Sequence, residues 1–143
     1  MTPTQIELIR ASWTKVEPIA DTAANLFYGR LFALDPSVRP MFSHTDMEKQ
    51  RKVLMQTLTV VVKSLDKLEQ LVPAVQALGR RHAGYGVRAK DFDTVGAALL
   101  WTLETGLGPD FDADAREAWA TAYGVLASVM IDAMAEVEEA PAA

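Results

Sequence analysis

The sequence of 143 residues contains no cysteine and no long hydrophobic run. The absence of cysteine excludes disulfides, thiolate metal ligands and iron–sulfur clusters bound by this chain. Hydrophobic residues make up 50% of the sequence, but no uninterrupted apolar run approaches the roughly 20 residues of a membrane-spanning helix. The first residues show neither a basic region nor an apolar signal core. We therefore expect a cytoplasmic protein with no membrane partner.

Acidic residues outnumber basic ones, so the formal net charge is -5. There is no basic stripe with interleaved aromatic residues, which argues against a nucleic-acid partner. The one local basic cluster consists of Arg80, Arg81 and Arg88. It can be either a solvated helix end or a clamp for an anionic group.

The sequence is rich in hydrophobic residues at helical spacing. Thr2 and Gln5 fit a capping box at the start of the first helix. Hydrophobic spacing and helix start and stop signals predict about seven helices of unequal length, including one that starts at Pro73 and carries His82. We expect a single domain over residues 1–143. Unequal helices with short corners favour an all-α fold with steep helix crossings over a simple four-helix bundle.

His82 is the residue with the clearest functional potential. Val75, Leu78, Gly79 and His82 follow one another at i, i+3, i+4 and i+7, which places the imidazole on the apolar helix face. A buried imidazole needs a partner for each ring nitrogen. A haem iron is one such partner, and the commoner alternative is a core histidine hydrogen-bonded to the protein. The other histidine, His44, lies in a polar corner where we expect it to be exposed.

Two polar residues interrupt helix faces that are otherwise apolar. Gln50 lies between Met47 and Leu54 on one predicted face, where a polar group must find a partner or cost stability. Tyr28 lies on the inner face of the second helix, one turn before Phe32. The alternative interpretation of Tyr28 is a core tyrosine whose hydroxyl reaches a backbone carbonyl.

Five segments, in this order along the chain, add a more specific signal: residues 26–32, 36–42, 50–54, 71–82 and 118–127. Together they resemble the globins, and specifically a bacterial single-domain globin similar to the haem domain of flavohaemoglobins. The resemblance covers nearly the whole chain. It implies an all-α globin fold of about seven helices packed around a haem pocket.

The resemblance also implies which residues hold the cofactor, haem b. His82 would be the proximal iron ligand through Nε2, with its Nδ1–H held by the backbone carbonyl of Leu78. Phe42 would pack flat against the porphyrin, and Arg81 or Arg88 would pair with a propionate. The other cofactor-binding residues are apolar and would line the cavity: Leu54, Leu58, Val95 and Leu99.

Tyr28 and Gln50 would hydrogen-bond a gas bound at the iron, whether dioxygen, nitric oxide or carbon monoxide. Each hydrogen bond to a charged acceptor contributes about 1.5–3 kcal/mol, so we expect high dioxygen affinity, suited to oxygen storage or delivery. Nitric oxide dioxygenation would require a separate reductase, because the sequence shows no flavin or nicotinamide domain. A haem-based gas sensor that acts through a partner protein is the alternative function. The sequence leaves monomer and homodimer equally open.

Two positions depart from the flavohaemoglobin pattern. Flavohaemoglobins resemble one another in placing a tyrosine and a glutamate around the proximal histidine, where this sequence, aligned from His82 and Trp119, has Phe92 and Met134. An imidazole hydrogen-bonded only to a carbonyl donates less electron density to iron than one bonded to an anionic network. The departures therefore argue against peroxidase-like activation of dioxygen.

Overall fold

The computed structural model describes residues 1–139, so the last four residues of the domain expected over 1–143 lie outside the description. Within the described residues there are helices and connecting segments but no strand, which confirms the all-α prediction. Six α-helices are found in this part of the chain: α1 (Pro3–Val16), α2 (Ala20–Leu34), α3 (Met47–Lys63), α4 (Leu68–Gly84), α5 (Ala89–Leu107) and α6 (Ala113–Glu139). Four short 3-10 segments join them: η1 (Glu17–Ile19), η2 (Pro36–Phe42), η3 (Leu65–Lys67) and η4 (Gly108–Asp110). Phe42 is the last residue of η2.

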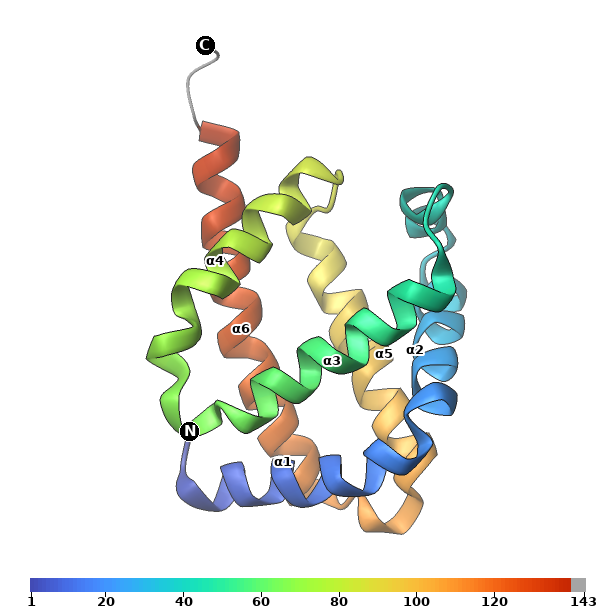
Figure 1. Ribbon diagram of the computed structural model, residues 1–143, viewed down its shortest axis with the longest axis vertical. Coiled ribbons are helices and arrows are strands. Elements are labelled where there is room, and N and C mark those ends of the chain that lie inside the picture. The colour runs from blue at the N-terminus through green and yellow to red at the C-terminus, as the bar shows by residue number, and fades with distance from the viewer. Residues whose placement is uncertain (140–143) are drawn as a thin grey trace.

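The helices run in several directions rather than side by side as in a parallel bundle (Figure 1). In this view α1 lies across the lower end of the molecule, α3 crosses the front, and α5 and α6 run lengthwise behind them. Extensive contacts join α4 to α6, α2 to α5 and α1 to α6. Steep crossings are the arrangement that the unequal helix lengths predicted.

Local sequence signals account for several helix ends. The backbone N–H of Gln5 donates to the Thr2 hydroxyl at 3.1 Å, and the Thr2 N–H donates to the Gln5 side chain at 3.0 Å. This is the predicted capping box, which is confirmed. At the C-terminal end of α5, Gly108 has a φ of 56°, a left-handed conformation that terminates the helix at little steric cost.

The predicted start of the His82 helix was wrong. Helix α4 begins at Leu68, and Pro73 lies inside it. A proline inside a helix removes the hydrogen bond that its own N–H would have donated, here to the carbonyl of Glu69, and its ring crowds that carbonyl. Because Glu69 is exposed, water can serve that carbonyl. The helix therefore continues through the proline to Gly84.

The close packing of α4 against α6 depends on Gly79. A Cβ added at Gly79 would lie only 2.6 Å from the carbonyl oxygen of Met130. The two backbones therefore approach more closely than any residue with a side chain would permit. Since His82 follows less than one turn after Gly79, this contact also fixes where the imidazole stands.

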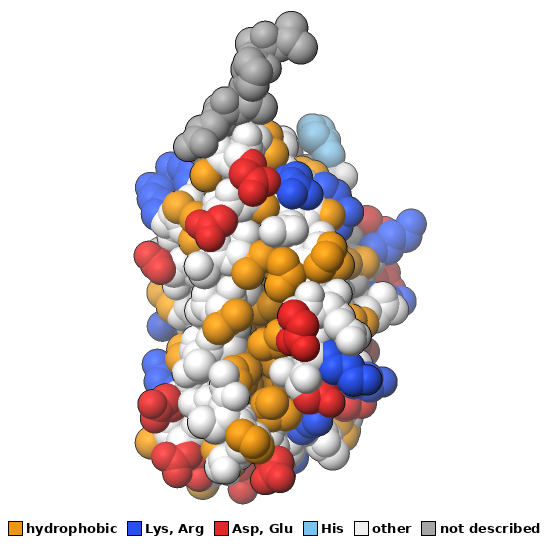
Figure 2. Space-filling view, turned by 90° about the vertical axis from the view of Figure 1, so that its left-hand side faces the viewer, with side chains coloured by type: hydrophobic (Ala, Val, Ile, Leu, Met, Phe, Trp, Pro, Cys, Tyr) orange, Lys and Arg blue, Asp and Glu red, His pale blue; other side chains and the backbone are white. Residues whose placement is uncertain are grey.

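The main core lies among α1, α2, α5 and α6. Its largest fully buried side chains are Ile9 and Leu103, and the rings of Trp13 and Trp119 pack with centroids 5.8 Å apart. Apolar side chains are not confined to this core. Figure 2 shows the face at the left of Figure 1, where hydrophobic side chains form a band that runs lengthwise between charged ones.

Helix α6 is unusually apolar for its length. Its stretch Ala113–Val137 reaches a mean hydropathy of 1.3, so by length and composition alone it is the one described helix that could cross a membrane. The core helix of a globular protein meets the same criterion. In this structure α6 buries Trp119 and Met134 against the rest of the protein.

Candidate functional site

His82 lies in the last turn of α4 and is half-buried. Its Nδ1 is 2.7 Å from the carbonyl oxygen of Leu78, one turn earlier. A carbonyl can only accept, so Nδ1 carries the proton and donates, and Nε2 presents a lone pair. This confirms the hydrogen bond predicted from the sequence. Among the described residues, none is hydrogen-bonded to Nε2.

The electrostatics of the site favour a neutral imidazole. Burial lowers the pKa of His82 below its ordinary value, and the charge of Arg81 lowers it further, while the bond to Leu78 works in the opposite direction. Only the neutral form has a lone pair to offer a metal. The site therefore keeps His82 in the form that can ligate iron.

Two aromatic rings lie beside the imidazole, and the nearer is Tyr85, whose centroid is 5.7 Å from that of His82. The centroid of Phe92 lies 6.5 Å from that of His82, and Phe92 packs in a second small core with Met134. The hydroxyl of Tyr123 donates to the backbone carbonyl of Phe92 at 2.6 Å and so does not point at the histidine. In the described part of the chain, the Leu78 carbonyl is thus the one hydrogen-bond partner of the His82 imidazole.

Tyr28 of α2 and Gln50 of α3 meet, although 22 residues separate them in sequence. The side-chain amide of Gln50 donates to the phenol oxygen of Tyr28 at 3.1 Å. This bond uses a lone pair of the phenol and leaves the phenol proton free to donate elsewhere. Burial raises the pKa of Tyr28, with opposing effects from Gln50 and the charge of Arg51. The phenol therefore remains protonated and remains a donor.

Three phenylalanines hold the Tyr28 ring. Its centroid lies 5.0 Å from that of Phe27, 6.1 Å from Phe32 and 5.7 Å from Phe42. Phe32 and Phe42 also touch each other edge-on at 5.5 Å. Sequence reasoning selected Phe42 but not Phe32 as a site residue. The available signal was the spacing of four residues from Tyr28, which places both rings on one helix face.

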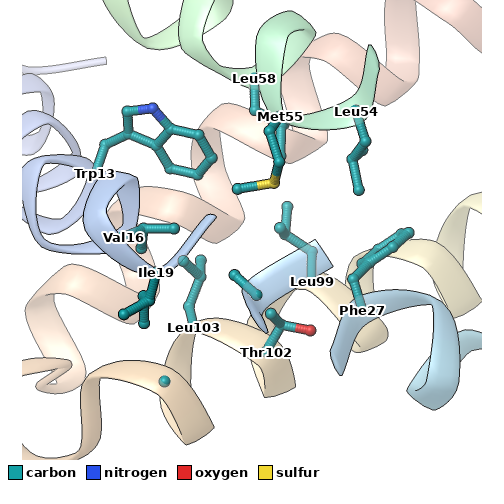
Figure 3. Close-up of a pocket in the computed structure, with 12 residues that line it drawn as sticks. Trp13, Val16, Ile19, Phe27, Leu54, Met55, Leu58, Leu99, Thr102 and Leu103 are labelled. Carbon is teal, nitrogen blue, oxygen red and sulfur yellow. The ribbon is translucent and has the colours of Figure 1, made fainter. Parts of the chain in front are cut away.

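The predicted apolar wall comes together from α3 and α5. Leu54 and Leu58 of α3 and Val95 of α5 are partly buried, Leu99 of α5 is buried, and all four belong to or pack against the main core. Behind them is a small apolar cavity (Figure 3). Leu54, Leu58 and Leu99 line this cavity, and Val95 does not.

The two arginines considered for an anionic group differ in their surroundings. Both are exposed, and in the described residues Arg81 has no ion pair. Arg88 lies 3.4 Å from the buried carboxylate of Asp91, which also accepts the Arg88 backbone N–H at 2.8 Å. Asp91 is a buried residue near the start of α5 that the sequence analysis did not single out. His44 is exposed in the turn before α3, as expected.

Comparison with known proteins identifies the family behind this geometry. The family model described as Globin matches residues 25–130 of this chain. The chain belongs to the globin family. The matched range contains Tyr28, Gln50 and His82.

Curated relatives of this globin include long and short proteins. Neuroglobin from Danio rerio is 31% identical over 137 residues, which cover 86% of this chain and 86% of that protein. Flavohemoproteins from Bacillus subtilis (strain 168) and Bacillus thuringiensis subsp. konkukian (strain 97-27) are each 29% identical, over 88% and 94% of this chain. The chain spans only 32% and 33% of the length of these two flavohemoproteins.

Two solved structures show the same fold over nearly the whole globin. A bacterial globin from Campylobacter jejuni has a TM-score of 0.85 and 28% identity, and covers 97% of this chain and 100% of its own. An engineered carbene transferase, made from a putative nitric oxide dioxygenase of Rhodothermus marinus, has a TM-score of 0.86 and 26% identity, with 96% of both chains covered. The predicted globin fold and the predicted likeness to flavohaemoglobin haem domains are both confirmed.

The family and its flavohaemoglobin relatives imply a haem group, and the residues present fit one. His82 offers an Nε2 lone pair that no described residue engages. Phe42, Leu54 and Leu58 are only partly buried, and their side chains leave apolar area that a flat apolar cofactor could cover.

Proposed function

We propose that this globin binds haem b through His82 Nε2 and holds dioxygen with high affinity, as an oxygen store or carrier. The observation that carries the proposal is the hydrogen bond from Gln50 to Tyr28. It turns two polar side chains, otherwise costly in an apolar setting, into one oriented pair with a free phenol proton.

Haem bound in this way would supply an iron atom with an open position for a diatomic gas. Tyr28 O–H and the second amide N–H of Gln50 would then donate to the gas. Dioxygen on ferrous iron carries partial negative charge, and a hydrogen bond to a charged acceptor contributes about 1.5–3 kcal/mol. We expect most of this contribution to appear as slower dioxygen release.

The remaining residues would seat and shield the cofactor. Phe42 would pack against the porphyrin, and the apolar wall of Leu54, Leu58, Val95 and Leu99 would exclude water, which slows iron oxidation. Arg81 is the better placed arginine for a propionate, because Arg88 already pairs with Asp91.

Nitric oxide dioxygenation is the enzymatic activity that we propose for the same site. Dioxygen and nitric oxide together contain the atoms of nitrate, but nitrate carries one additional electron. Each turnover therefore needs one electron from outside, and a separate reductase would supply it. Phe92, whose ring lies near His82, and Met134, which packs in one small core with Phe92, are both apolar, and this supports reversible binding over cleavage of the dioxygen bond.

Visible spectra of the purified protein, reconstituted with haem, test this proposal. We expect a five-coordinate ferrous form that gives a stable complex with dioxygen and with carbon monoxide. A protein that takes up no haem would contradict the proposal, and so would a six-coordinate ferrous form that binds neither gas.

A further inference from the structure

A groove at the surface lies between the start of α5 and the middle of α6, and we call it the α5–α6 groove. Its volume is about 330 Å³, at the lower end of the range of about 300–1,000 Å³ that small-molecule sites occupy. The two helices contact each other and run in opposite directions, so α5 begins and α6 ends toward the same end of the molecule (Figure 1). The lining consists of Phe92, Asp93, Tyr123, Gly124, Ala127, Ser128, Ile131 and Asp132.

Tyr123 leaves the groove open because its ring is held against α5. A Cβ added at Gly96 would lie only 2.8 Å from Cε2 of Tyr123, so the ring occupies the space that this glycine provides. The Tyr123 hydroxyl donates to the carbonyl of Phe92 at 2.6 Å and ties the ring to the same helix. The lining residues that follow on the exposed edge of α6 are small, Gly124 and Ser128, and do not fill the space.

The floor and the rim of the groove differ in chemistry. Phe92 and Ala127 are buried and form an apolar floor, and Ile131 extends it by one turn of α6. At the rim, Asp93 of α5 and Asp132 of α6 are both exposed. A ligand that covers the floor therefore meets carboxylates at the rim.

Both rim carboxylates are available to a cation. Within residues 1–139, neither Asp93 nor Asp132 has an ion pair with a lysine or an arginine. Ser128 lies four residues before Asp132 on the same helix edge and adds an exposed hydroxyl. In this part of the chain, no positively charged side chain lines the groove. Carboxylates only accept hydrogen bonds, so the complementary ligand carries N–H donors and positive charge.

The size of the groove favours a small molecule over a protein partner. A stable protein interface buries about 1,200–2,000 Å² of surface and involves about 20–30 residues on each side. Eight residues line this groove. They suffice for one small ligand and are too few for a stable protein interface.

We propose that the α5–α6 groove binds a small organic cation, with an ammonium or guanidinium group carried on an apolar body. The charged group would lie at the rim with Asp93 and Asp132, and the apolar body would cover Phe92 and Ala127. This site goes beyond the proposed function, which uses neither aspartate, and binding there does not depend on haem.

Isothermal titration calorimetry of the purified protein with phenethylammonium chloride measures this binding. 2-Phenylethanol has nearly the same size without the charge, so it reports the apolar floor alone. At low ionic strength we expect phenethylammonium to bind several-fold more tightly. The preference should shrink as sodium chloride is added, because salt screens exposed charges. Equal affinities for the two probes at low salt would overturn the proposal, and so would the absence of binding by either.

Three aspartate variants test whether the rim supplies the preference. Asp93→Asn and Asp132→Asn should each weaken phenethylammonium binding about two- to fivefold and leave 2-phenylethanol binding unchanged. Asp114→Asn removes the same charge from the first turn of α6, about 27 Å from Asp132 along the helix, and should affect neither probe. An equal loss in all three variants would indicate attraction to the net negative charge and would contradict the proposal.

Nuclear magnetic resonance locates the bound probe. We expect phenethylammonium to shift the methyl signals of Ala127 and Ile131, which line the groove, and to leave that of Ile9 in the main core unchanged. Shifts confined to other residues would overturn the proposal. If a second copy of this chain covers the groove instead, the same methyl signals will change with protein concentration in the absence of the probe. That result would also overturn the proposal.

Discussion

The Nδ1–H of His82 donates to the carbonyl oxygen of Leu78 at 2.7 Å, and this bond aims Nε2 away from its own helix. We predict that His82→Ala abolishes the normal haem spectrum, because the iron loses its only protein ligand. Circular dichroism should still show a largely helical protein. His44→Ala, at the exposed histidine, serves as the control and should keep the normal spectrum. Retention of that spectrum in His82→Ala would overturn the assignment of the ligand.

The apolar neighbours of His82 should set the reduction potential of the bound haem. We predict a lower potential in the double variant Phe92→Tyr with Met134→Glu, because an anionic hydrogen-bond network makes the imidazole a stronger donor to ferric iron. Phe92→Tyr with Met134→Gln has nearly the same size without the charge and should stay close to the unmodified protein. Potentiometric titration measures both. Identical potentials in the two variants would show that position 134 does not act on His82.

The close approach of α4 to α6 predicts a clear effect on stability. In Gly79→Ala the new Cβ would lie 2.6 Å from the Met130 carbonyl oxygen, so the helices must separate. We expect a loss of about 1–3 kcal/mol in the free energy of unfolding, the usual cost of overpacking. Gly124→Ala has open space around its Cβ and should gain up to about 1 kcal/mol from helix propensity. Urea unfolding measures both, and a neutral Gly79→Ala would contradict the contact.

Tyr28, which is buried, and Tyr123, which is partly buried, lead us to predict that stability falls at alkaline pH. Burial raises the pKa of both Tyr28 and Tyr123 in the folded protein. Above the ordinary tyrosine pKa of about 10, the unfolded chain ionises while the folded protein does not. Their contribution to stability is thus complete below that pH and is lost as the pH rises above it. Tyr28→Phe and Tyr123→Phe should each make the decline shallower in unfolding experiments, and an unchanged slope would show that neither phenol is shielded.

The local features of the site could be predicted from the sequence. The bond between His82 and Leu78 joins residues one helical turn apart, so helix geometry alone could predict it. The meeting of Tyr28 with Gln50 joins two helices that cross. Periodicity placed each residue on an apolar face, and only the resemblance to globins indicated that the two faces meet.

Features that depend on three-dimensional packing could not be predicted from the sequence. Pro73 looked like a helix start, but packing of the preceding apolar residues extends α4 back to Leu68. The small apolar cavity of Figure 3 is formed by four helices, so no pattern along one helix reveals it. Asp91 is different, because its pairing with Arg88 lies within one turn. That spacing is visible in the sequence.

The central claim is that Tyr28 donates a hydrogen bond to dioxygen, and the dissociation rate of dioxygen tests it most directly. Stopped-flow measurements would compare the unmodified protein, Tyr28→Phe and Tyr123→Phe, whose hydroxyl is bonded to the Phe92 carbonyl instead. We predict that Tyr28→Phe releases dioxygen faster by about one to two decades, and that Tyr123→Phe leaves the rate unchanged. An unchanged rate in Tyr28→Phe would contradict the account.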